Sequence, residues 1–360
     1  MSVQEQGPVQ PPSQPDAPKG AIDRRRSIIG GLIALVFLVV VFARIIPQVG
    51  DYSGAFALIA DLRFVDLLTL LGALLVYLAV YGTPYLAAAP GISFNDSEVV
   101  NNSRFAIGNG IPGGGAFSVA VGYAQLTFYR QTPTAATAAI GASGVWAAFV
   151  TLTLPITGVA ALALAGRDVS RYLVAALVGL AILVVVIVLF ALILRSERNA
   201  ERIGAFADRI IGGLLHRIRP HSTVTVSGSV LHLRHDIVGL VSKRWLWITL
   251  SNVAVSLGQF LILATAVRLV SVSDHHLLAV YGAWAISQLG IMIPVTPGGL
   301  GTVDAALIAL LVATGMSQAD ATAAALLWRA TYYFPQIVIG VCCIFFWRWQ
   351  ASRARHADTP

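Results

Sequence analysis

The sequence predicts an all-α polytopic membrane protein, with about six transmembrane helices and two re-entrant helical hairpins arranged as an inverted repeat. Hydrophobic residues make up 57% of the chain and Asp, Glu, Lys and Arg only 11%, whereas a soluble domain carries about 25% charged residues to face water. The apolar residues also occur in runs of about 20, the length at which a helix crosses a bilayer. Finally, two Pro-Gly-Gly breaks lie 185 residues apart, at Pro112 and Pro297.

Six apolar runs are long enough to span a bilayer as helices. They cover residues 28–46, 64–88, 134–165, 171–194, 245–270 and 319–347. Residues 1–26 begin with a Pro- and Gln-rich stretch that predicts a disordered tail. The first run lacks a small-residue cleavage site, so we expect an uncleaved anchor. The sequence therefore predicts one membrane domain over 27–350 and a second short tail at 351–360.

Two further apolar stretches are interrupted by proline and clustered glycine, which end helices. The first runs from Phe105 to Arg130 and the second from Leu277 to Met316. Non-helical backbone at membrane depth is tolerated only inside protein or beside a watery cavity. We therefore expect each stretch to enter the membrane and return on the same side as a hairpin.

The basic residues predict the orientation of the spans. They gather before the first span, in the loop 195–244 and after the last span. With both hairpins re-entrant, these groups share one side, so we expect cytoplasmic N- and C-termini in a plasma membrane. The net charge of +7 then reflects topology, and no nucleic-acid partner is expected. Within the loop, residues 203–218 predict a basic amphipathic helix, either gathering anionic lipid or serving as a plain topology anchor.

The two breaks belong to repeat halves at about 64–165 and 249–350. Ala136–Ala139 aligns with Ala321–Ala324 at the same offset as the Pro-Gly-Gly breaks. The single span 171–194 lies between the halves and inverts the second relative to the first. Inverted repeats whose broken helices meet near the midplane are typical of transporters. A duplication without transport, or two ordinary kinked spans, also fits the pattern.

Around the second break the sequence reads P-x-x-P-G-G-x-G from Pro294 to Gly301, with an acid three residues later and an Arg in the next span; the first-half counterpart runs from Asn109 to Gly115. These residues resemble the membrane domain of lysylphosphatidylglycerol synthases and its stand-alone, flippase-like relatives. The resemblance implies movement of an anionic or polar-headed lipid, a phospholipid or a polyprenyl-linked glycolipid, between leaflets. The acid is usually Glu and is Asp304 here. Larger members add an aminoacyl-transfer domain, and this sequence shows none, so aminoacyl-lipid synthesis is not expected.

Asp304 and Arg329 are the strongest candidates for binding a lipid headgroup. Ionisable residues within a membrane are costly and are usually paired or functional. The helix N-terminus at Asp304 favours an anion, either this carboxylate or a lipid phosphate, and the planar fork of Arg329 suits a phosphate. A purely structural pair between the two residues is the other interpretation.

The remaining candidates are glycines that let backbone N–H groups face a cavity, together with two polar side chains. Tight turns alone explain the glycines equally well, and polar residues in membrane helices often only join helices. The full set of substrate-binding candidates is Arg329, Asp304, Asn109, Gly113, Gly114, Gly298, Gly299, Gly301 and Tyr332.

The sequence shows no P-loop motif, so transport would be passive, ion-coupled or driven by a lipid-synthesising partner enzyme. We expect no cofactor, no metal and no enzymatic activity. A membrane enzyme acting on lipid phosphate is one alternative, although such sites need several convergent acids, histidines or metal ligands. A non-transporting subunit of an envelope-lipid assembly pathway is another.

Overall fold

A computed structural model describes residues 51–111, 114–196, 198–199, 226–271, 275–292 and 297–357. The predicted first span at 28–46 and the amphipathic helix at 203–218 lie outside these residues. In the described part the elements are α2 (Tyr52–Ala60), α3 (Phe64–Tyr81), α4 (Thr83–Ala88), α5 (Phe94–Gly110), α6 (Gly114–Phe128), α7 (Pro133–Leu164), α8 (Ser170–Arg195), α10 (Val226–Val270), α11 (Leu277–Ser287), η3 (Gln288–Met292), η4 (Pro297–Gly299), α12 (Thr302–Ala313) and α13 (Gln318–Ala357).

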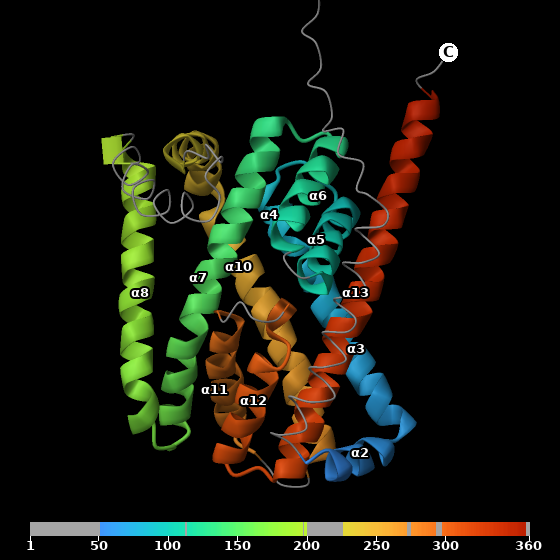
Figure 1. Cartoon of the computed structure of the whole chain (residues 1–360), viewed down its shortest axis with the longest axis vertical. Coiled ribbons are helices and arrows are strands. Elements are labelled where there is room, and N and C mark those ends of the chain that lie inside the picture. The colour runs from blue at the N-terminus through green and yellow to red at the C-terminus, as the bar shows by residue number, and fades with distance from the viewer. Residues whose placement is uncertain are drawn as a thin grey trace, which may run out of the picture.

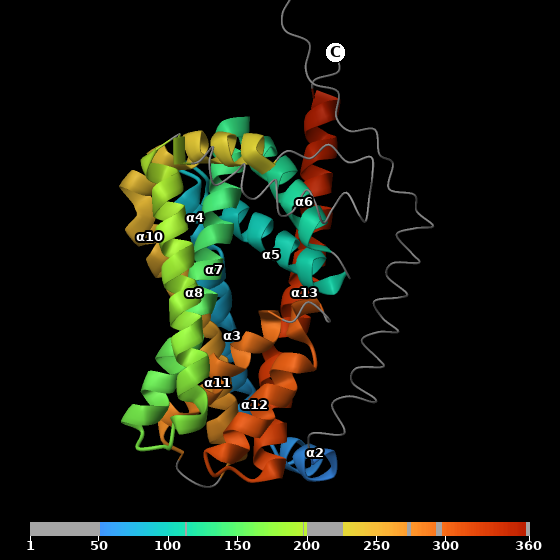
Figure 2. The same ribbon diagram turned by 60° about the vertical axis from the view of Figure 1, so that its left-hand side comes forward.

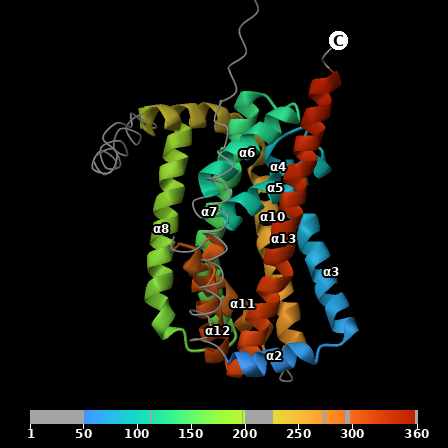
Figure 3. The ribbon, with the colours of Figure 1, turned by 45° about the vertical axis from the view of Figure 1, so that its right-hand side comes forward.

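The helices form an all-α bundle whose long members run between two ends of the molecule (Figure 1). Helices α7, α8, α10 and α13 extend along most of this length, while α2 lies across the end opposite the C-terminus (Figure 3). Within the described residues, four helical segments are long and apolar enough to cross a membrane: Phe64–Ala88, Pro133–Leu164, Ile237–Val270 and Gln318–Ala354. The all-α membrane fold class is therefore confirmed, and the number of six spans stays a prediction.

The two interrupted stretches form hairpins in opposite halves of the bundle. Helices α5 and α6 occupy the half that contains the C-terminus, and α11 and α12 occupy the other half (Figures 1 and 2). Each hairpin connects to the next long helix at its own end of the molecule, so the hairpins open in opposite directions. This is the arrangement that an inverted repeat predicts.

Helix boundaries repeat at the spacing seen in the sequence. Helix α6 ends at Phe128 and α12 at Ala313, and α7 begins at Pro133 and α13 at Gln318. Both pairs of boundaries are 185 residues apart. The repeat predicted from the Pro-Gly-Gly breaks therefore extends to the ends of whole helices, which single matches in an Ala-rich chain would not produce.

The first hairpin begins earlier than the apolar stretch from Phe105 indicates. Helix α5 already begins at Phe94, because Ser93 caps it by accepting a hydrogen bond from the Asp96 amide at 3.1 Å. Residues 94–104 are mostly polar, so the sequence gives no sign that they form a helix buried between its neighbours. From this helix, Ser97 and Asn101 donate hydrogen bonds to backbone carbonyls where α3 gives way to α4.

The predicted span 64–88 is one of the four candidate membrane segments, and its helix is divided at Gly82. Helix α3 ends at Tyr81 and α4 begins at Thr83, with Gly82 between them. Carbonyl groups at a helix end lack an intrahelical hydrogen-bond partner. Here side chains from α5 donate hydrogen bonds to two of these carbonyl groups. The predicted span 245–270 lies inside the longer helix α10, so residues 226–244 of the loop predicted at 195–244 are helical.

Candidate functional site

The second hairpin turns through three glycines in a conformation that other residues rarely adopt. The φ angles are +61° at Gly298, +67° at Gly299 and +85° at Gly301. At Gly298 a Cβ atom would also lie only 2.8 Å from the Tyr333 ring and 3.0 Å from Asn109 Oδ1. Glycine is required here both for the backbone conformation and for the close approach of two other helices.

Asp304 lies in the first turn of α12, immediately after this break. It is 4% exposed, and its Oδ2 accepts a hydrogen bond from the Gly301 amide at 2.8 Å. The helix N-terminus favours a negative charge at this place. Of the two anions that the sequence allowed there, the carboxylate itself takes the position in the structure.

Arg329 is the cation that faces this carboxylate. It extends from α13, is 2% exposed, and its Nε lies 2.7 Å from Asp304 Oδ1. Its Nη1 donates to the Tyr332 hydroxyl at 2.6 Å and to the Gly298 carbonyl at 3.4 Å. Among the described residues, the buried Nη2 has no hydrogen-bond partner. The carboxylate therefore uses one edge of the guanidinium and leaves a donor unused.

Aromatic rings enclose the guanidinium on several sides. Its central carbon lies 4.8 Å from the ring centroid of Trp328, 5.6 Å from that of Tyr332 and 5.5 Å from that of Tyr333. Aromatic faces attract a cation, and the effect is larger when water is excluded. The rings and the ion pair together hold the side chain of Arg329 in a fixed position.

The two hairpins meet beside this ion pair. Tyr333 of α13 donates its hydroxyl hydrogen to the Asn109 carbonyl, at the end of α5, over 2.8 Å. The Asn109 side chain donates to the Phe105 carbonyl at 3.2 Å, and its Oδ1 faces Gly298. We call the residues Asn109, Gly298, Asp304, Arg329, Tyr332 and Tyr333 the hairpin junction.

The structure thus brings together most of the predicted site residues, with two exceptions in the first hairpin. Gly113 lies outside the described residues. Gly114 begins α6, and a Cβ atom there would collide with the Ile107 carbonyl of α5. Gly114 is therefore explained by close packing within its own hairpin.

Several polar residues of this region went unnoticed in the sequence. Tyr333 and Trp328 line the arginine, and neither was among the predicted substrate-binding residues. A second polar chain lies beside it, in which Tyr77 of α3 donates to Gln336 Oε1 at 2.9 Å and accepts from Gln259 at 3.3 Å. Tyr77 was hidden within an apolar run. One signal was available, since Gln336 lies four residues after Tyr332 and therefore one turn further along the same helix face.

The arrangement offers a buried cation whose Nη2 group has no hydrogen-bond partner among the described residues, at the point where broken helices from opposite halves of the bundle meet. The Asp304 carboxylate lies 2.7 Å from Arg329 Nε and balances the charge of the guanidinium. A phosphate or another anionic headgroup oxygen is the natural acceptor for the remaining Nη2 donor.

The sequence matches a known protein family and one curated relative. It matches the family described as the lysylphosphatidylglycerol synthase TM region over residues 27–340. It is also similar to inner membrane protein YbhN of Escherichia coli (strain K12), with 26% identity over 148 residues. That match covers 41% of this chain and 46% of YbhN, so the chain matches less than half of that relative. The family match includes both hairpins and the hairpin junction.

Proposed function

This chain belongs to the family of the lysylphosphatidylglycerol synthase TM region, and we propose that it moves an anionic or polar-headed lipid between the leaflets of the cell membrane. The observation that carries the proposal is the buried Nη2 of Arg329, which lacks a partner among the described residues. A buried donor without a partner costs about 1–3 kcal/mol. A lipid phosphate passing the hairpin junction would remove that cost.

The inverted repeat supports transport rather than simple binding. The hairpins lie in opposite halves of the bundle (Figure 1), so each extends from the junction toward one leaflet. Broken helices that meet in the middle of inverted repeats form the binding sites of many transporters. In this proposal Arg329 binds the phosphate, Asp304 holds the guanidinium in place, and the lipid leaves chemically unchanged.

We further propose that the N- and C-termini face the cytoplasm. The basic residues of the sequence support this orientation through the positive-inside rule. YbhN, the relative that the chain resembles in part, is an inner membrane protein by name. A lipid-synthesising partner enzyme that supplies lipid on one side would give the movement its direction.

Purified full-length protein in vesicles tests the function. Fluorescent phosphatidylglycerol placed in both leaflets is bleached from outside by a membrane-impermeant reductant, and the lipid is then analysed by mass spectrometry. Bleaching beyond the outer leaflet with unchanged lipid supports a flippase. Chemical conversion would instead indicate an enzyme, and neither movement nor conversion would favour a non-transporting subunit.

Arg329→Lys in the same vesicles tests the assigned role of the arginine. Lysine keeps the positive charge but lacks the planar fork. We expect the variant to fold and to move phosphatidylglycerol at least tenfold more slowly. Full activity of the variant would contradict the assignment of phosphate binding to Arg329.

A further inference from the structure

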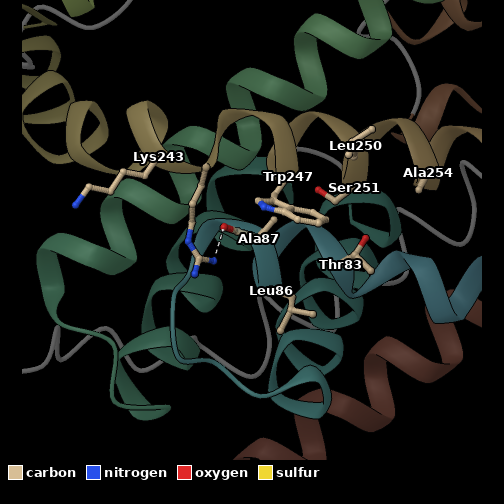
Figure 4. Close-up of a pocket in the computed structure, with 9 residues that line it drawn as sticks. Thr83, Leu86, Ala87, Lys243, Trp247, Leu250, Ser251 and Ala254 are labelled. Atoms are coloured by element: carbon tan, nitrogen blue, oxygen red, sulfur yellow. Dashed lines mark hydrogen bonds between the residues drawn. The ribbon is translucent and has the colours of Figure 1, made fainter.

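A groove lies between α4 and α10 (Figure 4), and none of its lining residues belongs to the hairpin junction. Its volume is about 750 Å³. The α4 wall contributes Thr83, Leu86 and Ala87. The opposite wall is a stretch of α10 that begins with the basic pair Lys243 and Arg244. The groove lies in the half of the bundle that contains the first hairpin (Figure 1).

The α10 wall changes from basic to apolar along its length. Lys243, Trp247, Leu250 and Ala254 line the groove and are spaced by four, three and four residues, which places them on one face of the helix. At 1.5 Å per residue, the distance from Lys243 to Ala254 is about 16 Å. That is close to half of a hydrocarbon core of about 30 Å, so the groove is about as long as one leaflet is deep.

The basic end is shaped for an anion. Arg244 is half-buried, and its Nη1 donates to the Ala87 carbonyl at 3.2 Å (Figure 4). This contact anchors the guanidinium by one nitrogen at the end of α4. Lys243 is exposed beside it. Among the described residues that line the groove none is acidic, so no lining carboxylate competes for these two cations.

The apolar end is open toward the surroundings of the bundle. Trp247 is 65% exposed and Leu250 is 49% exposed. Large apolar side chains at such exposure fit contact with lipid rather than with water. Tryptophan concentrates where the headgroups meet the hydrocarbon, and Trp247 stands one turn from Lys243. The basic pair then lies at headgroup depth.

We propose that this groove binds one anionic glycerophospholipid. The phosphate contacts Lys243 and Arg244, and an acyl chain follows Trp247 and Leu250 toward Ala254. Three features of the groove fit this occupant: its two cations, its length of about one leaflet, and its opening to the membrane. The assignment is independent of transport, because a protein that moves no lipid would still bind one here.

Native mass spectrometry of the full chain tests the groove. The probes are dioleoyl phosphatidylglycerol and dioleoyl phosphatidylcholine, which share acyl chains and differ in charge. Each basic residue near an anionic surface contributes about 1 kcal/mol, so we expect Lys243→Gln/Arg244→Gln to weaken phosphatidylglycerol binding by about thirtyfold. The double variant Arg348→Gln/Arg353→Gln removes the same charge from exposed positions on α13 and is expected to keep wild-type binding.

A second variant tests the groove without changing its charge. Ala254→Trp fills the apolar end, and we expect it to weaken phosphatidylglycerol binding at least fivefold. Equal losses in the α13 control would reduce the effect to general electrostatics and overturn the proposal. Unchanged binding in Ala254→Trp would also overturn it. Displacement of the lipid by excess inorganic phosphate would assign the site to small anions instead. Should the paired variant fail to fold, the exposed Lys243→Gln alone replaces it, with an expected loss of about fivefold.

Discussion

Replacing Asp304 by Asn tests whether the ion pair stabilises the hairpin junction. The substitution keeps the size of the side chain and removes its charge. Arg329, at 2% exposure, then remains as a buried cation whose other hydrogen-bond partners are a tyrosine hydroxyl and a backbone carbonyl. Breaking a buried pair in this way costs about 3–5 kcal/mol.

The aromatic rings around Arg329 lower the expected cost. Ring centroids at 4.8–5.6 Å place the guanidinium within reach of cation–π attraction, which contributes up to about 2 kcal/mol when water is excluded. We therefore expect a loss of about 1–3 kcal/mol, which is the cost of the broken pair less the cation–π attraction. The measurement is the thermal unfolding midpoint of the purified protein, followed by tryptophan fluorescence at a fixed scan rate in one detergent.

The double variant Asp304→Asn/Arg329→Gln separates the charge from the shape of the site. Removing both charges leaves no buried uncompensated ion, so we expect most of the lost stability to return. Asp66→Asn is the matched control, because Asp66 pairs at 3.3 Å with Arg63, whose side chain is 81% exposed. An exposed pair contributes little, so we expect a smaller shift of the unfolding midpoint. A midpoint for Asp304→Asn equal to wild type, or a double variant no better than Asp304→Asn, would refute this reasoning.

Three further predictions concern the break, the junction and the topology. Gly298→Ala adds a Cβ atom at a φ of +61° and 2.8 Å from the Tyr333 ring, so it should lower the unfolding midpoint, whereas Gly144→Ala, with open space around it in α7, should match or exceed wild type. Tyr333→Phe removes a 2.8 Å hydrogen bond between α13 and the first hairpin and should cost about 0.5–1.5 kcal/mol; an unchanged midpoint would show that the bond contributes nothing. With both native cysteines replaced, Ser352→Cys should react with an impermeant maleimide from the cytoplasmic side and Ser317→Cys from the opposite side; labelling of both from one side would contradict the fold.

Much of the fold could be predicted from the sequence, because a bilayer demands long apolar helices and because proline and glycine mark where they break. The repeat offset held for helix ends as well as for the breaks. The junction of α3 and α4 could not be predicted in this way. Gly82 stands inside an apolar run, and the groups that satisfy its carbonyl come from α5, whose polar sequence does not resemble a membrane segment.

The candidate site was predictable in part for a similar reason. Asp304 and Arg329 stand out because charge is rare in apolar segments, and the structure joins them at 2.7 Å. Tyr333 and Trp328 do not stand out, because an aromatic residue in a membrane helix most often packs against its neighbours. Their contact with the guanidinium depends on how α13 is rotated about its axis relative to α12, and this rotation cannot be predicted from a single sequence.

The most direct test of the central claim compares two lipids in vesicles that contain wild type or Arg329→Lys. One lipid is fluorescent phosphatidylglycerol, and the other is fluorescent glucosylceramide, whose polar headgroup lacks a phosphate. If Arg329 binds the phosphate during transport, wild type moves phosphatidylglycerol faster than glucosylceramide. The variant then moves phosphatidylglycerol at least tenfold more slowly than wild type, while its glucosylceramide rate stays within twofold of wild type. Equal losses on both lipids, or phosphatidylglycerol moved at the wild-type rate by the variant, would contradict the claim.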